Sequence, residues 1–478
     1  MRVSVGKINI TQTLANVENL LAKDRSLSPA VRGMIELLVT IIHLLVAKLG
    51  LNSSNSSISP SQDARRKRGA KPKGNGLKRK PGGQKGHPGT TLEPVDDPDH
   101  IENIAVDRRT LPPGSYKSAG YEARQVFDIV IHRYVVEYRA EILEDAHGRQ
   151  FVAQFPAAVS RPVQYGKGVK VQAVYTSQQQ LIPYDRIRDY FWDQCGIPIS
   201  TGSIFRFNQE AYMLLEPFES FLVGQLLQQA LLHADETGIH INKTLYWLHC
   251  LCNDQWTLFF PHAKRGGDAI KAMGVLEHFH GRLGHDHWKS YFQFLCIHFL
   301  CNAHHLRELQ RAWEQDGQRW ARNMRLVLLE IHDATTKAGG CLDQTTAKRF
   351  RSRYRNILTR ADHECPPATS RNTASQRGRI AQSKSRNLLD RLREFETETL
   401  RFMTDPLVPF TNNQCENDLR MTKVQQKISG CFRSFEGAQI FCRVRSYLST
   451  CRKHDIQATE ALQALFEGRL SEIISRLE

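Results

Sequence analysis

The segment QALLHADETGIHI, residues 229–241, decides the fold, because an apolar run leads directly into two acids. Short apolar runs of this kind are typical of buried strands. A carboxylate such as Asp235 is costly inside a core but useful at the rim of a sheet. We therefore expect a strand that brings Asp235 to a rim, where it can meet other polar groups.

The residues after this segment continue an alternation of strands and helices. Three further runs are expected to be strands: LYWLHCLC (245–252), WTLFFPH (256–262) and GRLGHDHW (281–288). Residues 268–280 predict a helix, and IHFLCNAHHLREL (297–309) predicts a strand that runs into a helix. This order is typical of an α/β fold, with Asp286 at the end of a strand like Asp235.

A third acid stands on a helix predicted for NNQCENDLRMTKVQQKISG, residues 412–430, which Asn412 and Asn413 would cap. Four of its residues are spaced to share one face: Glu416, Arg420, Lys423 and Lys427. This face suits a site where a metal and a DNA backbone meet. An ordinary solvated face with one Glu–Arg pair would show the same spacing.

Three carboxylates on separate elements suit a hard divalent cation, Mg²⁺ or Mn²⁺. Three such acids can hold two ions about 4 Å apart, which is the arrangement of many phosphodiester-cleaving enzymes. The candidate catalytic and metal-binding residues are therefore Asp235, Asp286 and Glu416. Taken singly, an Asp after a strand is more often a turn residue, and spacing alone does not show that the acids converge.

The cysteines add two smaller features. Cys301 and His304 resemble half of a metal site, but no second Cys/His pair follows at zinc-finger spacing. We therefore favour a structural role for both, in which they brace the site through packing and hydrogen bonds. Cys250 and Cys252 lie on one face of a strand and are expected to be core residues. No CxxC pair occurs among the 11 cysteines, so reduced thiols are expected.

The charge of the chain points to a polyanionic partner. The formal net charge is +16, and residues 64–85 hold ten Lys or Arg and no acid. This segment is predicted to be a flexible arm that binds DNA phosphates, although a merely solvated linker would have the same composition. The residues expected to contact DNA there are Arg65, Arg66, Lys67, Arg68, Lys78, Arg79 and Lys80.

The remaining segments carry less chemistry. Residues 28–50 predict an apolar helix, either half of a coiled coil between two chains or a helix packed on its own domain. YEARQVFDIVIHRYVVEYRAEIL (121–143) predicts two or three strands of a small β module. Residues 165–225 are expected to be helical, with Trp192, Phe205 and Phe218 in the core. Charges interrupt the apolar residues 34–49 and no signal peptide is apparent, so a cytoplasmic protein without a membrane span is expected.

Several ordered motifs together resemble the IS66-family transposases. They are HADETGIHI (233–241), GRLGHDHWKSY (281–291), CNAHHLREL (301–309), NNQCENDLRMTKVQQKISGCFRS (412–434), and, before them, SSNSSISPSQD (53–63) and KRKPGGQKGHPGTTL (78–92). The resemblance runs from about residue 50 to about residue 470. Because the motifs occur in order, they are more specific together than any one of them alone.

The resemblance implies a DDE transposase with a ribonuclease-H-like core and a divalent metal. Asp235, Asp286 and Glu416 match the family's three acids, and Cys301 and His304 match a Cys-x-x-His element near the second. It also implies DNA partners, namely element ends and target DNA, a homodimer or higher oligomer, and a possible need for accessory proteins from the same element. The zinc module of many relatives is not expected in residues 93–160, which contain no cysteine. His285 and His287 replace the small residues usual around the second acid.

The expected fold is therefore α/β and multidomain, and its predicted parts follow in chain order. They are an N-terminal helical region (1–51), a basic linker (52–92), a small β module (93–160), a helical connecting or DNA-binding region (161–225), the first part of the catalytic core (226–309), a helical insertion (310–405) and the last core helices (406–478). The predicted function is DNA cleavage and strand transfer. The alternative is a catalytically inactive DNA-binding protein derived from a transposase, with a membrane-surface protein as a weaker third option.

Overall fold

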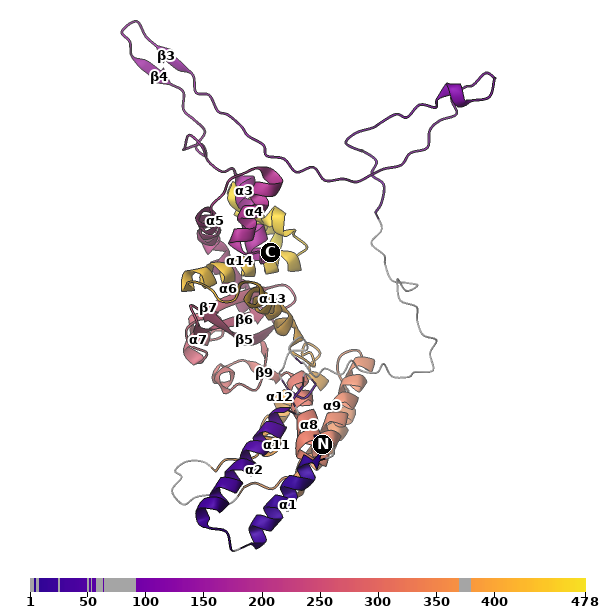
Figure 1. The fold of residues 1–478 in the computed structure, drawn as a ribbon, viewed down its shortest axis with the longest axis vertical. Helices are drawn as coiled ribbons and strands as arrows, with labels where there is room; N and C mark the ends of the chain where they lie inside the picture. Colours follow the sequence, from indigo (N-terminus) through magenta and orange to yellow (C-terminus); the bar gives the residue numbers. More distant parts are fainter. Residues whose placement is uncertain are drawn as a thin grey trace.

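A computed structural model describes residues 4–5, 8–24, 26–49, 51–52, 54–56, 63, 92–368 and 380–478 of the chain. The seven linker residues expected to contact DNA lie outside the described residues: Arg65, Arg66, Lys67, Arg68, Lys78, Arg79 and Lys80. The described chain folds as helices around one mixed sheet, with two long extensions (Figure 1). It is an α/β protein, as expected.

The central sheet has five strands in the order β7-β6-β5-β8-β9. They are β5 (Leu231–Ile241), β6 (Thr244–Cys252), β7 (Thr257–His262), β8 (Arg282–His285) and β9 (Ile297–Leu300). The strands β5, β6 and β7 are antiparallel, whereas β8 and β9 run parallel to β5. Asn242 and Lys243 join β5 to β6 with φ angles of 46° and 68°, as a tight two-residue hairpin requires.

Two hydrophobic clusters cover opposite faces of this sheet. Leu232 and Ala234 of β5 belong to one cluster, and Ile239 and Ile241 belong to the other. Because side chains alternate along a strand, these two pairs point to opposite faces. The face that includes Ile239 packs against α13 (Asn413–Ser429). The helices of the first cluster are α3 (Lys167–Val174), the π-helical turn η2 (Tyr175–Gln179), α4 (Tyr184–Cys195), α5 (Thr201–Leu214), α6 (Glu216–Leu227), α14 (Phe435–Lys453), α15 (Ala458–Glu467) and α16 (Leu470–Leu477).

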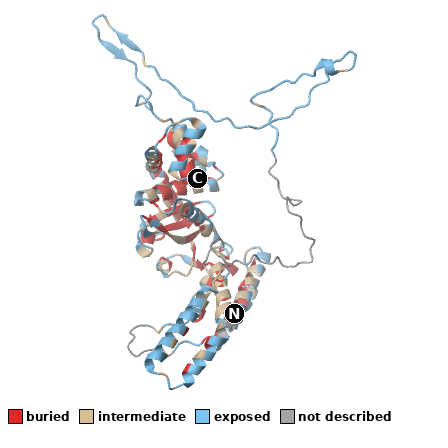
Figure 2. Cartoon of the chain, viewed as in Figure 1, coloured by how far each residue is buried: buried red, intermediate tan, exposed pale blue. Residues whose placement is uncertain are grey.

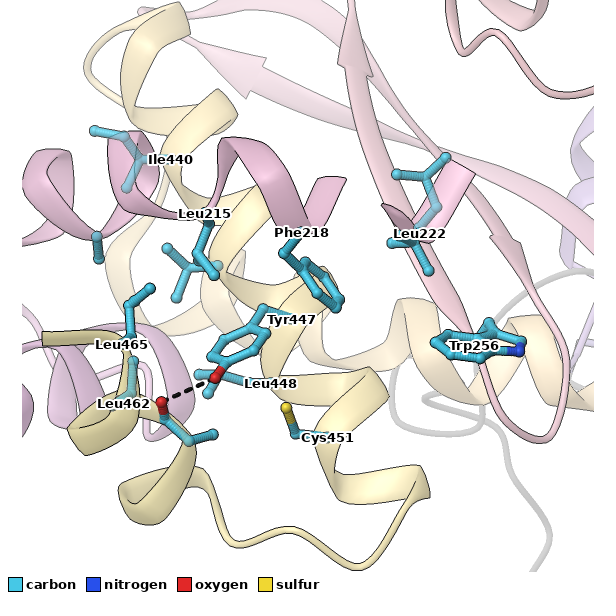
Figure 3. Close-up of a cluster of buried hydrophobic side chains, with 14 of the residues drawn as sticks. Leu215, Phe218, Leu222, Trp256, Ile440, Tyr447, Leu448, Cys451, Leu462 and Leu465 are labelled. Carbon is cyan, nitrogen blue, oxygen red and sulfur yellow. Dashed lines mark hydrogen bonds between the residues drawn. The ribbon is translucent and has the colours of Figure 1, made fainter. Parts of the chain in front are cut away.

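The first cluster is centred on aromatic side chains (Figure 3). The rings of Phe218 and Tyr447 meet edge to face at 5.0 Å, and the Tyr447 hydroxyl donates to the carbonyl of Ala461 at 2.9 Å. Phe218 is fully buried, as expected, and Phe205 is half-buried against the same core. The expectation for Trp192 was wrong, because its side chain lies on the outer surface of α4 and is 62% exposed.

The stretch between the sheet and α13 is helical and has its own core. Its elements are α8 (Asn302–Asp316), α9 (Arg319–Lys337), α10 (Gln344–Glu364), α11 (Lys384–Glu394), α12 (Glu396–Leu400) and the short turn η4 (Arg401–Met403). Trp320, Leu328 and Tyr354 are buried there, and the Tyr354 hydroxyl donates to the carbonyl of Leu392 at 2.7 Å. Within the sheet region the helix expected for 268–280 is shorter: α7 (Gly267–Ala272) ends before Gly274, whose φ is +70°.

The two extensions correct the expectation for residues 93–160. The described chain there contains the turn η1 (Arg108–Thr110) and one hairpin, β3 (Ile142–Glu144) with β4 (Gln150–Val152), instead of strands across 121–143. Its apolar side chains are exposed, Tyr121 by 95% and Val126 by 91% (Figure 2). An isolated two-stranded hairpin buries too little surface to form a core, so this segment is not a packed β module.

The N-terminal part begins with β1 (Ser4–Val5) and β2 (Ile8–Asn9), followed by α1 (Ile10–Lys23) and α2 (Pro29–Leu49). The apolar stripe of α2 is exposed, with Met34 at 67%, so the stripe is not packed on its own domain within the described residues. By length and composition, residues Pro29–Val46 could also cross a membrane, with mean hydropathy 1.7. One such helix near the N-terminus is weak evidence for a membrane span.

Candidate active site

The first two acids stand where the parallel part of the sheet ends. Pairing between β5 and β8 stops at His233 and Gly284, and Asp235 and Asp286 each lie two residues further along. Asp235 points to the same face of β5 as His233, and Asp286 directly follows β8, so both acids lie just past this end of the parallel pairing. Asp235 is therefore within β5 and not at its end, which corrects the sequence expectation. β8 ends at His285, so its pairing with β5 does not continue beside Asp235.

Asp235 is a half-buried acid in a negatively charged setting. Burial raises the pKa of its carboxyl well above the usual range, and Glu236, Asp286 and Glu416 raise it further, against a hydrogen bond from the Glu236 N–H. Asp286 accepts a hydrogen bond from the Trp288 N–H at 2.8 Å. The structure thus brings the three predicted acids close enough for each of the other two to act on Asp235.

Glu416 reaches the site from α13 and is held by α8. Its Oε1 lies 3.4 Å from Nη2 of Arg307 and 3.8 Å from Nδ1 of His304. Burial lowers the pKa of His304 first, and Arg307 lowers it further, while Glu416 opposes the shift. Arg307 was missed in the sequence, although it stands three residues after His304 and so shares that face of α8.

Asn412 fixes the start of α13 to the sheet. Its side-chain N–H donates to the carbonyl of Ala234 at 2.9 Å, and its Oδ1 accepts from Nδ1 of His233 at 2.6 Å. Its backbone N–H donates to Sγ of Cys301 at 3.1 Å. The helix begins at Asn413, but the Asn412 side chain does not cap it, contrary to expectation. Asn412 instead ties three elements together beside Asp235.

Some of the described side chains are close enough together to hold a metal ion, and Glu416 is one of them. Among the described residues, two groups place three potential ligand atoms within 4.8 Å of one another: Cys301, His304 and Glu416, and Cys250, Cys252 and Cys415. The three carboxylates are not such a set. A two-ion site does not need them to be, since ions about 4 Å apart can share one acid and divide the others. Negative charges on nearby acids repel one another, and a cation bound between them relieves this repulsion.

A second acid, Glu236, has a full set of partners. Its side chain is 1% exposed, and Arg265 pairs with its Oε1 at 2.5 Å while the Tyr291 hydroxyl donates to its Oε2 at 2.7 Å. The Arg265 guanidinium lies between two indole rings, 4.8 Å from Trp247 and 4.4 Å from Trp288. This network borders the three acids and was not predicted, because its residues are far apart in the chain.

Two histidine pairs flank Asp286. Nε2 of His285 lies 3.0 Å from Nδ1 of His298, and Nδ1 of His287 lies 3.0 Å from Nε2 of His305. Burial lowers the pKa of His285 and of His287 to about 3. These side chains are therefore neutral near pH 7. His285 and His287 thus pack beside the loop that holds Asp286 as neutral side chains.

The basic face of α13 is exposed beside the acids. Arg420, Lys423 and Lys427 lie on the solvent side of the helix, on the same face as Glu416. Nζ of Lys423 donates to the carbonyl of Gly238 at 3.2 Å. Burial lowers the pKa of Lys423, and the nearby Asp235 opposes that shift. A polyanion that approaches the acids would meet this face.

Comparison with known families gives two matches. The family described as "Transposase IS66 family" matches residues 162–440, and a family of unknown function, DUF6444, matches residues 7–93. A comparison with curated proteins found no match. The first match covers more than half of the chain and includes Asp235, Asp286 and Glu416. The chain therefore belongs to the IS66 family of transposases.

Proposed function

We propose that this transposase is catalytically active, hydrolysing phosphodiester bonds at the ends of its element and joining the freed 3′-hydroxyl to target DNA. One observation carries the proposal. The pKa of the half-buried Asp235 carboxyl is raised by burial, by the adjacent Glu236, and by Asp286 and Glu416, which reach it from other parts of the chain. Such a gathering of acids is unfavourable alone and suits a bound divalent cation.

The sheet supports a ribonuclease-H-like core. An antiparallel β5-β6-β7 unit is followed by two strands parallel to β5, and α13 brings Glu416 back to the same face after the helical insertion. We accordingly propose that residues 226–309 and 406–478 form the core, that 310–405 are an insertion, and that 161–225 connect or bind DNA. The hairpin-containing 93–160 would then be an arm and not a domain with its own core.

The three acids would hold Mg²⁺ or Mn²⁺, which supplies Lewis acidity at the scissile phosphate when bound. Asp235 lies within electrostatic reach of both other acids, so it would be one of the residues that hold the metal. Arg307 and His304 orient Glu416 through contacts to its Oε1. Asn412 fixes the distance between α13 and β5. The chain thus sets the positions of its acids before DNA arrives.

DNA would lie along the basic face of α13. Arg420, Lys423 and Lys427 provide exposed cations next to the acids, and the linker of residues 52–92 adds further positive charge. Contacts of this kind hold the phosphate backbone and make binding weaken with salt. Because two element ends must be processed together, we also propose a homodimer or higher oligomer on DNA, acting in the cytoplasm, with accessory proteins of the element as possible partners.

The test is cleavage of DNA that carries the element's own ends, in Mg²⁺ or Mn²⁺. Asp235→Asn, Asp286→Asn and Glu416→Gln should each lower the cleavage rate by at least about 100-fold while DNA binding stays nearly unchanged. The matched control is Asp333→Asn, which removes an exposed acid on α9. Wild-type protein that binds the ends but cleaves neither strand would instead support the inactive DNA-binding alternative. Retained cleavage in one acid variant would remove that residue from the site.

A further inference from the structure

Three cysteines meet in the interior beside the candidate active site. Cys250 and Cys252 of β6 and Cys415 of α13 place their sulfur atoms within 4.8 Å of one another. All three are reduced, and their side chains are at most 1% exposed. Neither the family match nor the proposed cleavage assigns them a role.

The fold explains why the three sulfur atoms meet. Cys250 and Cys252 are two residues apart on β6 and therefore point to one face of the sheet. The register pairs Asp235 with Cys250, so this is also the face on which the acids lie. The helix α13 packs on that face, and its first buried positions are Cys415 and, one turn later, Leu419.

The arrangement is that of a thiolate metal site. Metal–sulfur bonds of about 2.3 Å place three sulfur atoms around one ion roughly 4 Å apart. The three atoms here are already within 4.8 Å, so closure needs a shift of less than about 1 Å in any pair. We propose that Cys250, Cys252 and Cys415 bind one thiophilic d¹⁰ metal ion of the Cu⁺ and Zn²⁺ class.

The surroundings favour a soft ion over Mg²⁺. The three cysteines belong to an apolar cluster that includes Leu248, Phe259 and Leu419, with Lys453 and Asp418 at its edge. Soft thiolates select Cu⁺ or Zn²⁺, whereas hard oxygen donors select Mg²⁺. The buried ammonium of Lys453 donates to the carbonyl of Asn253, next to Cys252, at 2.7 Å and pairs with Asp418. Because Asp418 already balances much of this positive charge, only part of it is left to offset the negative charge of the thiolates.

An ion in this place would fix one half of the active site against the other. Cys415 directly precedes Glu416, and Cys250 lies opposite Asp235, so the ion would link the helix of the third acid to the sheet of the first. Metal binding itself does not depend on the proposed cleavage. It can therefore be tested whether or not the protein cuts DNA.

The experiment titrates metal-free, reduced full-length protein with Cd²⁺, as the probe for Zn²⁺, and with Cu⁺, each against a competing chelator. The ultraviolet thiolate-to-metal charge-transfer band reports binding, and its intensity counts the thiolates. The wild type should retain about one ion per chain with a three-thiolate band. Cys252→Ala should lower retention at least about tenfold, and Cys415→Ala tests the same point from the helix. The metal that the protein retains against the stronger of the competing chelators is the preferred one.

The matched control is Cys442→Ala, which removes another fully buried cysteine of the same hydrophobic cluster. It should bind the ion as the wild type does. The ion should also raise the melting temperature of the wild type and of Cys442→Ala, but not of Cys252→Ala. Equal retention by wild type and Cys252→Ala would overturn the proposal and place the metal elsewhere, for instance at Cys301 and His304. An equal loss in Cys442→Ala would overturn it as well.

Discussion

The side chain of Asn412 donates a hydrogen bond to the carbonyl of Ala234, the residue directly before Asp235, at 2.9 Å. This contact joins the helix that carries Glu416 to the strand that carries Asp235. It is buried, since Asn412 is 2% exposed. The amide of Asn412 is therefore the contact nearest to Asp235 among those that hold α13 on the sheet.

Asn412→Ala should consequently impair the site more than the fold. Loss of the amide leaves the Ala234 carbonyl and His233 without this partner, which costs about 1–3 kcal/mol of stability. Cleavage of end DNA should fall about 10–100-fold. Asn413→Ala, at the adjacent exposed position, is the control and should change neither quantity. Equal effects of both substitutions would mean that Asn412 acts only as part of the helix start.

The pair of Arg265 and Glu236 should matter for stability. Arg265→Ala leaves a carboxylate that is 1% exposed without its cation, and unfolding in urea should show a loss of up to about 3 kcal/mol, since Arg265 itself is 39% exposed. Adding Glu236→Gln to Arg265→Ala should restore part of this loss by removing the unpaired charge. Lys264→Ala, next in sequence and exposed, should stay within about 0.5 kcal/mol of wild type. A double variant no more stable than Arg265→Ala would contradict the assigned pairing.

Position 284 should not tolerate a side chain, because β8 and β9 approach each other closely there. A Cβ on Gly284 would overlap the Phe299 ring, so Gly284→Ala should lower the melting temperature, with a cost of about 1–3 kcal/mol. Gly224, in the middle of α6, has open space around the same position. Gly224→Ala should therefore be neutral or stabilising by up to about 1 kcal/mol. The opposite order of the two melting temperatures would show that the strand packing is misplaced.

The stability of the protein should fall in mild acid because of buried histidines. Burial lowers the pKa of His249 to about 4, so the folded chain leaves this side chain neutral where the unfolded chain binds a proton. Its contribution is complete above about pH 6.5 and is lost as the pH falls toward 4, by about 1.4 kcal/mol per pH unit. Urea unfolding of His249→Gln should show a shallower decline over that range.

The control for this pH effect is His240→Gln, which removes an exposed histidine of β5. It should keep the slope of the wild type between pH 6.5 and pH 4. Comparing slopes separates the titration of His249 from the constant cost of losing its packing, which shifts the whole curve. A slope for His249→Gln equal to that of the wild type would show that His249 does not remain neutral in the folded chain.

The parts of the fold that the sequence predicts best are those with strong local patterns. The apolar runs of β5 to β9 and the helices of 310–405 follow from periodicity. The pairing of β5 with β8 then brings Asp235 and Asp286 near each other. The predicted length of the helix after Gly267 and the predicted burial of Trp192 were wrong, because both properties depend on tertiary packing. Apolar and polar residues alternate across 121–143 as in a strand, but no other part of the described chain covers the apolar side chains. The alternation alone was therefore not sufficient to predict strands.

The site shows the same division. The three candidate acids and the basic face of α13 were predicted from spacing and from the family resemblance, and their role in catalysis stays a prediction. The contacts that position the acids could not, because Arg307, Asn412 and Arg265 act on partners far away in the chain. Hydrogen bonds between distant residues leave no periodic trace in a sequence. Only the spacing of Arg307 from His304 offered a signal, and it is a weak one.

The most direct measurement of the central claim is a titration of Mn²⁺ followed by electron paramagnetic resonance of the unbound ion, with DNA ends present. If Asp235, Asp286 and Glu416 form one metal site, the wild type and Asp333→Asn should bind Mn²⁺ alike, and Asp235→Asn should bind it at least about tenfold more weakly. Equal Mn²⁺ affinity in Asp235→Asn and the wild type would contradict the claim.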